Sequence, residues 1–149
     1  MIRLQERPGL LLAVIRREVT PALLPRVVPE CCGLVWQALK AQGLRGGRNV
    51  AVYWDDVIRV EAGVELLSPF TEAADVIQSS TPAGLVASAF HFGPYGTLGR
   101  THDMIHAWCR ANGPRLLGPR WEIYGHWQST WDTDPSRIET EVAYSVTPS

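Results

Sequence analysis

One order of elements occurs twice along the chain, and this repeat constrains the fold more than any other feature of the sequence. Each half runs through an apolar strand, a helix that starts at a proline, a glycine stop, a strand with a tyrosine, a turn and an alternating strand. The matched pairs are Pro21 with Pro94, Gly43 with Gly113, Tyr53 with Tyr124, and Val64 with Val142. Their separations run only from 70 (Gly43 to Gly113) to 78 (Val64 to Val142), which indicates an internal duplication. Two such units side by side would leave a concave cleft between them.

Periodicity predicts the elements of the first half. Proline is tolerated in a first helical turn but not inside a helix, so Pro21, Pro25 and Pro29 predict a short turn before the main helix. In the last strand apolar residues alternate with polar ones such as Glu61, which predicts a half-buried antiparallel strand with Glu61 on its polar face. The expected elements are a strand over 10–19, a helix from about Pro29 to Gly43, a strand over 49–54, a turn at Asp55-Asp56 and a strand over 58–66.

The second half has the same outline after a boundary near residues 69–73. Its expected elements are strands over 74–79 and 85–92, a helix from about Tyr95 to Asn112, and strands over 121–127 and 138–146. The sequence therefore predicts an α+β fold of duplicated β-α-β-β units related by a pseudo-twofold axis, with an antiparallel sheet, two main helices and a central ligand cleft. We expect a single domain over residues 1–149, with internal halves of about 1–70 and 71–149.

Composition excludes several classes of protein. A net charge of -1 gives no basic footprint for direct nucleic-acid binding. The longest apolar run, residues 10–15, is far too short to span a membrane, and Met1 opens almost directly into strand-like sequence without a signal peptide. The cysteines are odd in number and Cys31 is adjacent to Cys32, so we expect reduced thiols in a cytoplasmic protein. Six tryptophans in 149 residues favour an aromatic-lined cavity or interface.

Glu122 is the residue to which the sequence gives the clearest functional meaning. It lies on a predicted strand among aromatic residues, and Tyr124 and His126 share its face. A carboxylate in such a place needs a partner or attracts a cation that neutralises it. In the repeat, Glu122 of the second half matches Ala51 of the first half. Because the first half has no acid at this position, the difference suggests that Glu122 has a function specific to the second half. The alternative is a surface strand on which Glu122 forms a weak ion pair with Arg120.

The sequence also allows two other kinds of chemistry, general-base catalysis at Glu122 and metal binding at His102 and His106. A partly buried Glu122 can serve as a general base that activates water, with Tyr124 or Tyr95 donating a hydrogen bond to a leaving oxygen. No nucleophile motif or phosphate-binding loop accompanies it. His102 and His106 have a helical spacing compatible with a metal, but solvated or capping histidines are the favoured interpretation, and we expect no metal and no cofactor.

An ordered series of short motifs resembles the GyrI-like small-molecule-binding domains. No single motif is specific, but their order along essentially the whole chain is. The motifs are His91-x-Gly93-Pro94-Tyr95, a helix with Leu98 and Trp108, Asn112-Gly113, Gly118-Pro119, Glu122-x-Tyr124, Asp134-Pro135 and Thr140-Glu141-Val142, with a looser match at Val14-Ile15-Arg16, residues 39–43 and Val52-Tyr53-Trp54-Asp55.

The resemblance implies a duplicated fold with a cleft at the pseudo-twofold axis. It also implies that Glu122 matches the buried acid with which the effector-binding domains of multidrug-responsive transcription activators recognise cationic, lipophilic drugs. Some stand-alone relatives resemble hydrolases of strained cyclopropane-bearing electrophiles, and others are gyrase inhibitory proteins that act through a protein partner. The fold also resembles that of haem-binding SOUL proteins, which keeps a haem interpretation open. Because Met1 is close to the first strand, a role in transcription would need a partner protein such as a regulator.

These observations predict a stand-alone domain that binds an amphipathic, cationic or polycyclic small molecule beside Glu122, for sensing or for sequestration. The alternatives are a hydrolase of cyclopropane-bearing electrophiles, with Glu122 as base and Tyr124 assisting, and a gyrase-directed interaction module. The aromatic residues expected around the ligand are Tyr124, Tyr95, Tyr53, Trp54, Phe92, Trp108 and Tyr144.

Overall fold

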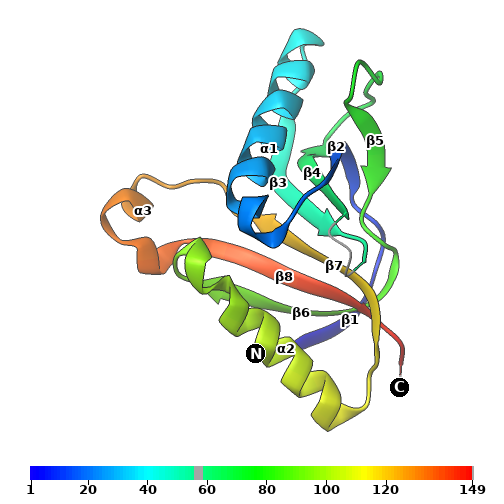
Figure 1. The fold of residues 1–149 in the computed structure, drawn as a ribbon, viewed down its shortest axis with the longest axis vertical. Helices are drawn as coiled ribbons and strands as arrows, with labels where there is room; N and C mark the ends of the chain where they lie inside the picture. The colour runs from blue at the N-terminus through cyan, green and yellow to red at the C-terminus, as the bar shows by residue number, and fades with distance from the viewer. Residues whose placement is uncertain (56–58, 149) are drawn as a thin grey trace.

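Two helices lie on one face of an eight-stranded antiparallel sheet (Figure 1), in a computed structural model that describes residues 1–55 and 59–148. The strand order is β1-β6-β8-β7-β3-β4-β2-β5. The strands are β1 (Arg3–Arg7), β2 (Leu11–Glu18), β3 (Gly46–Tyr53), β4 (Arg59–Leu66), β5 (Ile77–Ser80), β6 (Gly84–Phe92), β7 (Leu116–Tyr124) and β8 (Glu139–Val146). The helical elements are η1 (Pro21–Leu23), α1 (Leu24–Ala41), η2 (Tyr95–Thr97), α2 (Leu98–Asn112), α3 (Thr130–Thr133) and η3 (Pro135–Arg137).

The duplication expected from the sequence is visible in the sheet. Strands β2, β3 and β4 with α1 repeat as β6, β7 and β8 with α2, and the two halves join where β3 pairs with β7. At the centre of that pairing Ala51 lies directly opposite Glu122, the position that the repeat assigns to it. The remaining strands cross over, because β1 pairs with β6 and β5 pairs with β2. The predicted α+β fold of duplicated units is therefore confirmed.

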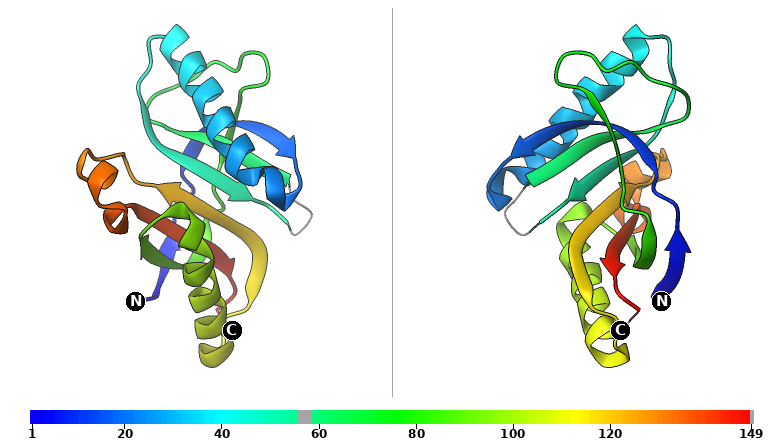
Figure 2. Two further views of the ribbon diagram at one scale, coloured as in Figure 1. Left: turned by 60° about the vertical axis from the view of Figure 1, so that its left-hand side comes forward. Right: turned by 90° about the vertical axis from the view of Figure 1, so that its right-hand side faces the viewer.

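Apolar side chains fill both faces of the sheet. On one face α1 packs on β2–β4 and α2 packs on β6 and β8 (Figure 2), with Val35 and Ile105 among the fully buried residues. On the other face, side chains from both halves form a third cluster around Trp121. Among the described residues, no helix is long and apolar enough to cross a membrane.

The first main helix begins earlier than the proline pattern predicts. It starts at Leu24 directly after η1, so Pro25 lies in its first turn and Pro29 lies inside the helix. The interior proline removes one backbone donor, but the buried side of α1 around Val28 and Cys32 holds the helix against the sheet. The second half has the same sequence of elements, since α2 follows η2 directly.

Strand ends also differ from the expected ones. β1 was not predicted, because Arg3–Arg7 is a polar edge strand without an alternating apolar pattern. β7 covers Leu116–Tyr124 rather than 121–127, and it contains an irregularity near Gly118, whose φ is +112°. His126 therefore lies beyond the strand and does not share the face of Glu122. The fourth expected strand begins at Ile77 rather than at residue 74. Asp56 and Ile58, which were placed in a turn and a strand, lie outside the described residues.

The strand that carries Glu61 was predicted to be half-buried, but its polar face is covered at Glu61. The Glu61 side chain is buried, with 4% of the residue exposed. The sheet curls so that β5 and the end of β3 bring Ser79 and Trp54 over it, and Arg16 approaches from β2. The carboxylate accepts a hydrogen bond from each of these three side chains, which offsets the cost of burying its charge.

Candidate ligand-binding cleft

The starts of α1 and α2 face each other across β3 and β7, and the space between them is the interhelical cleft. It consists of two adjoining hollows of about 590 Å³ and about 610 Å³. Both hollows are lined by Leu24, Tyr53, His102 and Glu122. Because the joint between β3 and β7 lies beneath it, the cleft sits at the pseudo-twofold axis of the fold.

Glu122 is buried at the base of the interhelical cleft, with 7% of the residue exposed. Its Oε1 accepts a hydrogen bond from the Tyr124 hydroxyl at 2.6 Å, and its Oε2 lies 2.6 Å from Nε2 of His102. Both contacts are in the short range of hydrogen bonds to a charged acceptor. The alternative of a surface strand carrying an exposed Glu122 does not hold, since the residue is enclosed between the sheet and α2.

His102 extends the contacts of Glu122 to β8. Its Nδ1 lies 2.6 Å from the Tyr144 hydroxyl, which in turn lies 3.1 Å from Nε2 of His106. These histidines were expected to be solvated or capping residues, and the structure contradicts that expectation. His102 stands one helical turn after Leu98 and almost one turn before Ile105, so the apolar stripe of the helix already placed it on the buried side.

Three tyrosines form the aromatic walls of the interhelical cleft. The rings of Tyr95 and Tyr124 meet edge to face with centroids 5.6 Å apart, and the Arg120 guanidinium lies 5.3 Å from the centroid of Tyr53. Burial, followed by the negative charge of Glu122, raises the pKa of Tyr124 and of Tyr53 well above the usual value. Both phenols therefore stay protonated at physiological pH and offer ring surface and hydroxyl donors, not charge.

The structure brings five of the eight predicted site residues into this cleft. Glu122, Tyr124, Tyr95 and Tyr53 line the first hollow or both, and Tyr144 lines the second. Trp54, Phe92 and Trp108 line neither hollow. Lining residues that the sequence did not single out for a ligand include Cys32, Asn49, His102 and His106.

Strand parity and helix phase explain the three misplaced aromatic residues. Tyr53 points toward the helices, so its neighbour Trp54 points to the other face of the sheet, where its indole donates to Glu61 at 2.9 Å. Phe92 ends β6 with 65% of the residue exposed. Trp108 packs against the α2 core cluster and lines neither hollow of the cleft.

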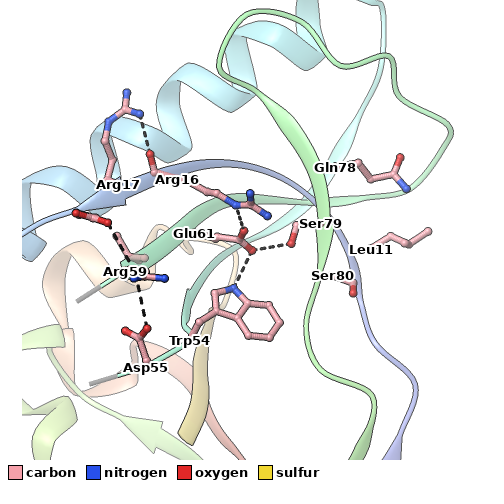
Figure 3. A pocket seen from close by; sticks show the side chains of 12 residues that line it. Leu11, Arg16, Arg17, Trp54, Asp55, Arg59, Glu61, Gln78, Ser79 and Ser80 are labelled. Carbon is pink, nitrogen blue, oxygen red and sulfur yellow. Dashed lines mark hydrogen bonds and ion pairs between the residues drawn. The ribbon is translucent and has the colours of Figure 1, made fainter. Parts of the chain in front are cut away.

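A larger hollow of about 760 Å³ lies on the opposite face of the sheet, around Glu61 (Figure 3). Among the described residues, its charged lining consists of three arginines and three acidic residues. The buried acid has a counterpart in the other half, because Glu141 on β8 pairs with Arg7 of edge strand β1 at 2.6 Å, much as Glu61 holds Ser79 of β5. An acid present in both halves that fixes an edge strand indicates a structural role. Glu122, opposite Ala51, has no such counterpart.

Within residues 1–55 and 59–148, no group of three or more His, Cys, Asp or Glu side chains is placed to hold one ion. His102 and His106 instead meet at the Tyr144 hydroxyl.

The cysteines give a first testable prediction. All three are unpaired and buried, and burial raises the pKa of Cys32, which lines the cleft, to about 12. At about pH 8 only roughly one Cys32 in ten thousand is then a thiolate, the reactive form. We expect a chromogenic disulfide reagent to label the native protein very slowly and to titrate three thiols at once in denaturant. Rapid labelling of one thiol in the native protein would contradict this.

The fold and the cleft together define a small-molecule-binding domain. Residues 1–146 match the GyrI-like small molecule binding domain family, and the chain belongs to that family. No curated protein gives a significant match to the sequence.

Solved structures share the fold over nearly the whole chain. The C-terminal domain of EcmrR has a TM-score of 0.79 and 23% identity, with 99% of this chain and 97% of that chain covered. A hydrolase from Listeria innocua has a TM-score of 0.66 and 12% identity, covering 98% and 91%. SAV2435, solved with tetraphenylphosphonium bound, has a TM-score of 0.63 and 12% identity, covering 99% and 94%. At these identities the likeness establishes the fold.

Proposed function

We propose that this domain binds amphipathic organic cations in the interhelical cleft, with Glu122 as the countercharge, and so senses or sequesters them. The observation that carries the proposal is a buried carboxylate at the base of an aromatic-lined cleft. Among the described residues that line the cleft, Glu122 is the one acid. A ligand cation beside it would find charge complementarity in a place with little water to screen it.

The walls of the cleft suit the rest of such a ligand. The rings of Tyr53, Tyr95 and Tyr124 offer π faces, each adding roughly 0.5–2 kcal/mol of attraction to a desolvated cation. Between the helices the wall is apolar, and it can cover a lipophilic body. Its apolar members are Leu24, Pro25, Val28, Pro29 and Leu98. Pockets of a few hundred cubic ångström with a few convergent polar groups are typical of drug-sized ligands.

A structural relative supports the same class of ligand. SAV2435 is described with tetraphenylphosphonium, a lipophilic cation without an ionisable proton. Its likeness to this chain is in the fold alone, so the proposal rests on Glu122 and the tyrosines and takes this relative as a choice of probe.

A hydrolase is the second candidate, favoured by one contact. The Tyr124 hydroxyl donates to Glu122 at 2.6 Å, which places a proton donor and a carboxylate base together in the cleft. Both carboxylate oxygens already accept hydrogen bonds, so the base would need to hold water on a remaining lone pair. A Listeria innocua relative of the same fold is described as a hydrolase.

Calorimetric titration tests the proposal, and a parallel incubation tests the hydrolase alternative. Tetraphenylphosphonium and methyltriphenylphosphonium are compared with triphenylphosphine oxide, which has the same three phenyl groups as the second cation and no net charge. We expect saturable binding of one cation per chain, at least about tenfold tighter than the neutral compound. Equal affinities of the cations and the neutral compound, or no binding of any of them, would overturn the proposal. A cyclopropane-bearing alkylator is incubated in parallel, and enzyme-dependent product detected by mass spectrometry would favour the hydrolase.

A further inference from the structure

We propose that His102 is the built-in cation of the interhelical cleft, and that an organic cation binding beside Glu122 expels a proton from His102. This inference rests on the proposed function and adds a coupling to pH that the function alone does not require. The inference rests on the contacts that link Glu122, His102 and Tyr144, and on the ways in which hydrogens can be placed on these contacts.

The contacts at His102 form a chain that runs from α2 to both central strands. Nε2 of His102 lies 2.6 Å from Glu122, and Nδ1 lies 2.6 Å from the Tyr144 hydroxyl. The hydroxyl also lies 3.1 Å from Nε2 of His106. An ionised carboxylate only accepts hydrogen bonds, so Nε2 of His102 carries a hydrogen whenever Glu122 is charged.

Two arrangements of hydrogens satisfy this chain, and they differ by one proton. In one, a neutral His102 accepts the Tyr144 hydroxyl hydrogen at Nδ1, and His106 donates to the hydroxyl oxygen. In the other, His102 is an imidazolium that donates from both nitrogens, and the hydroxyl turns to donate to Nε2 of a neutral His106, whose own hydrogen then lies on Nδ1. Only hydrogens move between the two. The network can therefore gain or lose a proton while its heavy atoms stay in place.

Charge decides between the two arrangements. In the empty cleft His102 is in direct contact with the buried Glu122 carboxylate, and an imidazolium at this position would balance the carboxylate charge. A ligand cation placed beside Glu122 would leave one acid facing two cations. Release of the His102 proton restores neutrality, and Nε2 still donates to the carboxylate.

Among the described residues that line the cleft, no acid other than Glu122 offers a second countercharge. On α2 itself, Asp103 is adjacent in sequence but does not line the cleft, and His106 has its pKa lowered by burial and then by the charge of His102. The groups from packed elements are Arg120, Glu122 and Tyr124 on β7, Tyr144 on β8, Tyr53 on β3, Tyr95 on η2 and Cys32 on α1. Burial raises the pKa of Tyr53, Tyr95, Tyr124 and Cys32, which keeps these four uncharged.

The coupling has a defined sign. The complex holds fewer protons than the free protein, so affinity for a permanent cation rises with pH while free His102 is charged. It gains at most about tenfold per pH unit for one released proton and levels off once free His102 is neutral. A neutral ligand should show neither effect.

Proton release is measured directly by titrating tetraphenylphosphonium calorimetrically in buffers of different ionisation enthalpy, at about pH 6 and at about pH 8. Wild-type protein should release up to about one proton per cation at the lower pH and almost none at the higher pH. In His102→Gln, which keeps a donor toward Glu122 without a charge, release should vanish and affinity at the lower pH should rise by roughly tenfold. His126→Gln is the matched control, because His126 lies outside the cleft, and it should behave like wild type.

The outcomes separate this inference from the function on which it rests. Tight cation binding without proton release overturns the inference and leaves the proposed function standing. Release that persists in His102→Gln also overturns it, since the proton then comes from a group other than His102. Failure of tetraphenylphosphonium to bind at either pH overturns the proposed function, and the inference fails with it.

Discussion

Replacing Glu122 by Gln is expected to weaken tetraphenylphosphonium binding by at least about 30-fold. The amide is nearly isosteric and keeps one oxygen, which can accept from either the Tyr124 hydroxyl or His102, while its NH2 group replaces the other oxygen. The change therefore removes the charge with little change of shape. Removing one partner of a buried charge pair typically costs about 2–5 kcal/mol, and each 1.4 kcal/mol is about tenfold in affinity. Triphenylphosphine oxide should bind the variant and the wild type equally well. The measurement is calorimetry on both proteins with both compounds.

Glu61→Gln is the matched control for that experiment. Glu61 is at least as buried as Glu122, but it lies on the other face of the sheet, where it holds Arg16, Trp54 and Ser79. This variant should lose stability and keep its affinity for the cation once it is folded. If Glu61→Gln weakens cation binding as much as Glu122→Gln does, the effect is general destabilisation and the assignment of the countercharge to Glu122 is wrong.

A second large effect is expected from Gly63→Ala, which should lower the free energy of unfolding by about 3 kcal/mol or prevent folding. Gly63 lies in β4 between β2 and β3. An added Cβ would stand 1.9 Å from the Ala13 carbonyl oxygen and 2.8 Å from the Val14 Cα. Both are backbone atoms of a paired strand, so β2 would have to separate from β4. Urea unfolding followed by circular dichroism measures the loss.

Gly33→Ala provides the opposite expectation with the same chemical change. Gly33 lies on the exposed side of α1, and a Cβ there meets nothing within 4 Å. Alanine should stabilise the protein by about 0.5–1 kcal/mol, because glycine is a poor helix former. Equal stabilities of Gly63→Ala and wild type would show that β2 and β4 do not approach each other as described.

Much of the architecture could be predicted because the same order of elements occurs in both halves of the sequence. Matching Tyr53 with Tyr124 sets Ala51 against Glu122, and these residues face each other across the central strand pair. Strand parity then places Glu122 and Tyr124 on the same side. The repeat could also have located the start of α1, since α1 and α2 each follow a 3₁₀ turn. The start was predicted too late because proline was not expected inside a helix. In the structure, packing of α1 on the sheet outweighs the loss of one backbone hydrogen bond at Pro29.

The partners of Glu122 could not be predicted with the same certainty. His102 reaches Glu122 from a helix twenty positions earlier in the chain, and this depends on how α2 lies across the sheet. Trp54 was assigned to the cleft by residue type, although its place next to Tyr53 on a strand directs it to the opposite face. The burial of Glu61 on the polar face of its strand was not predicted, because alternation cannot show that a curled sheet covers its second face. Aromatic content predicted that a cleft exists, but register and curvature decide which side chains reach it.

A crystal structure of the complex with tetraphenylphosphonium tests the central claim most directly. The account predicts the cation between α1 and α2, with phenyl groups against Tyr53, Tyr95 and Tyr124 and with Glu122 as the nearest charged acid. A cation bound in the hollow around Glu61, or elsewhere on the surface with the interhelical cleft empty, would contradict the account.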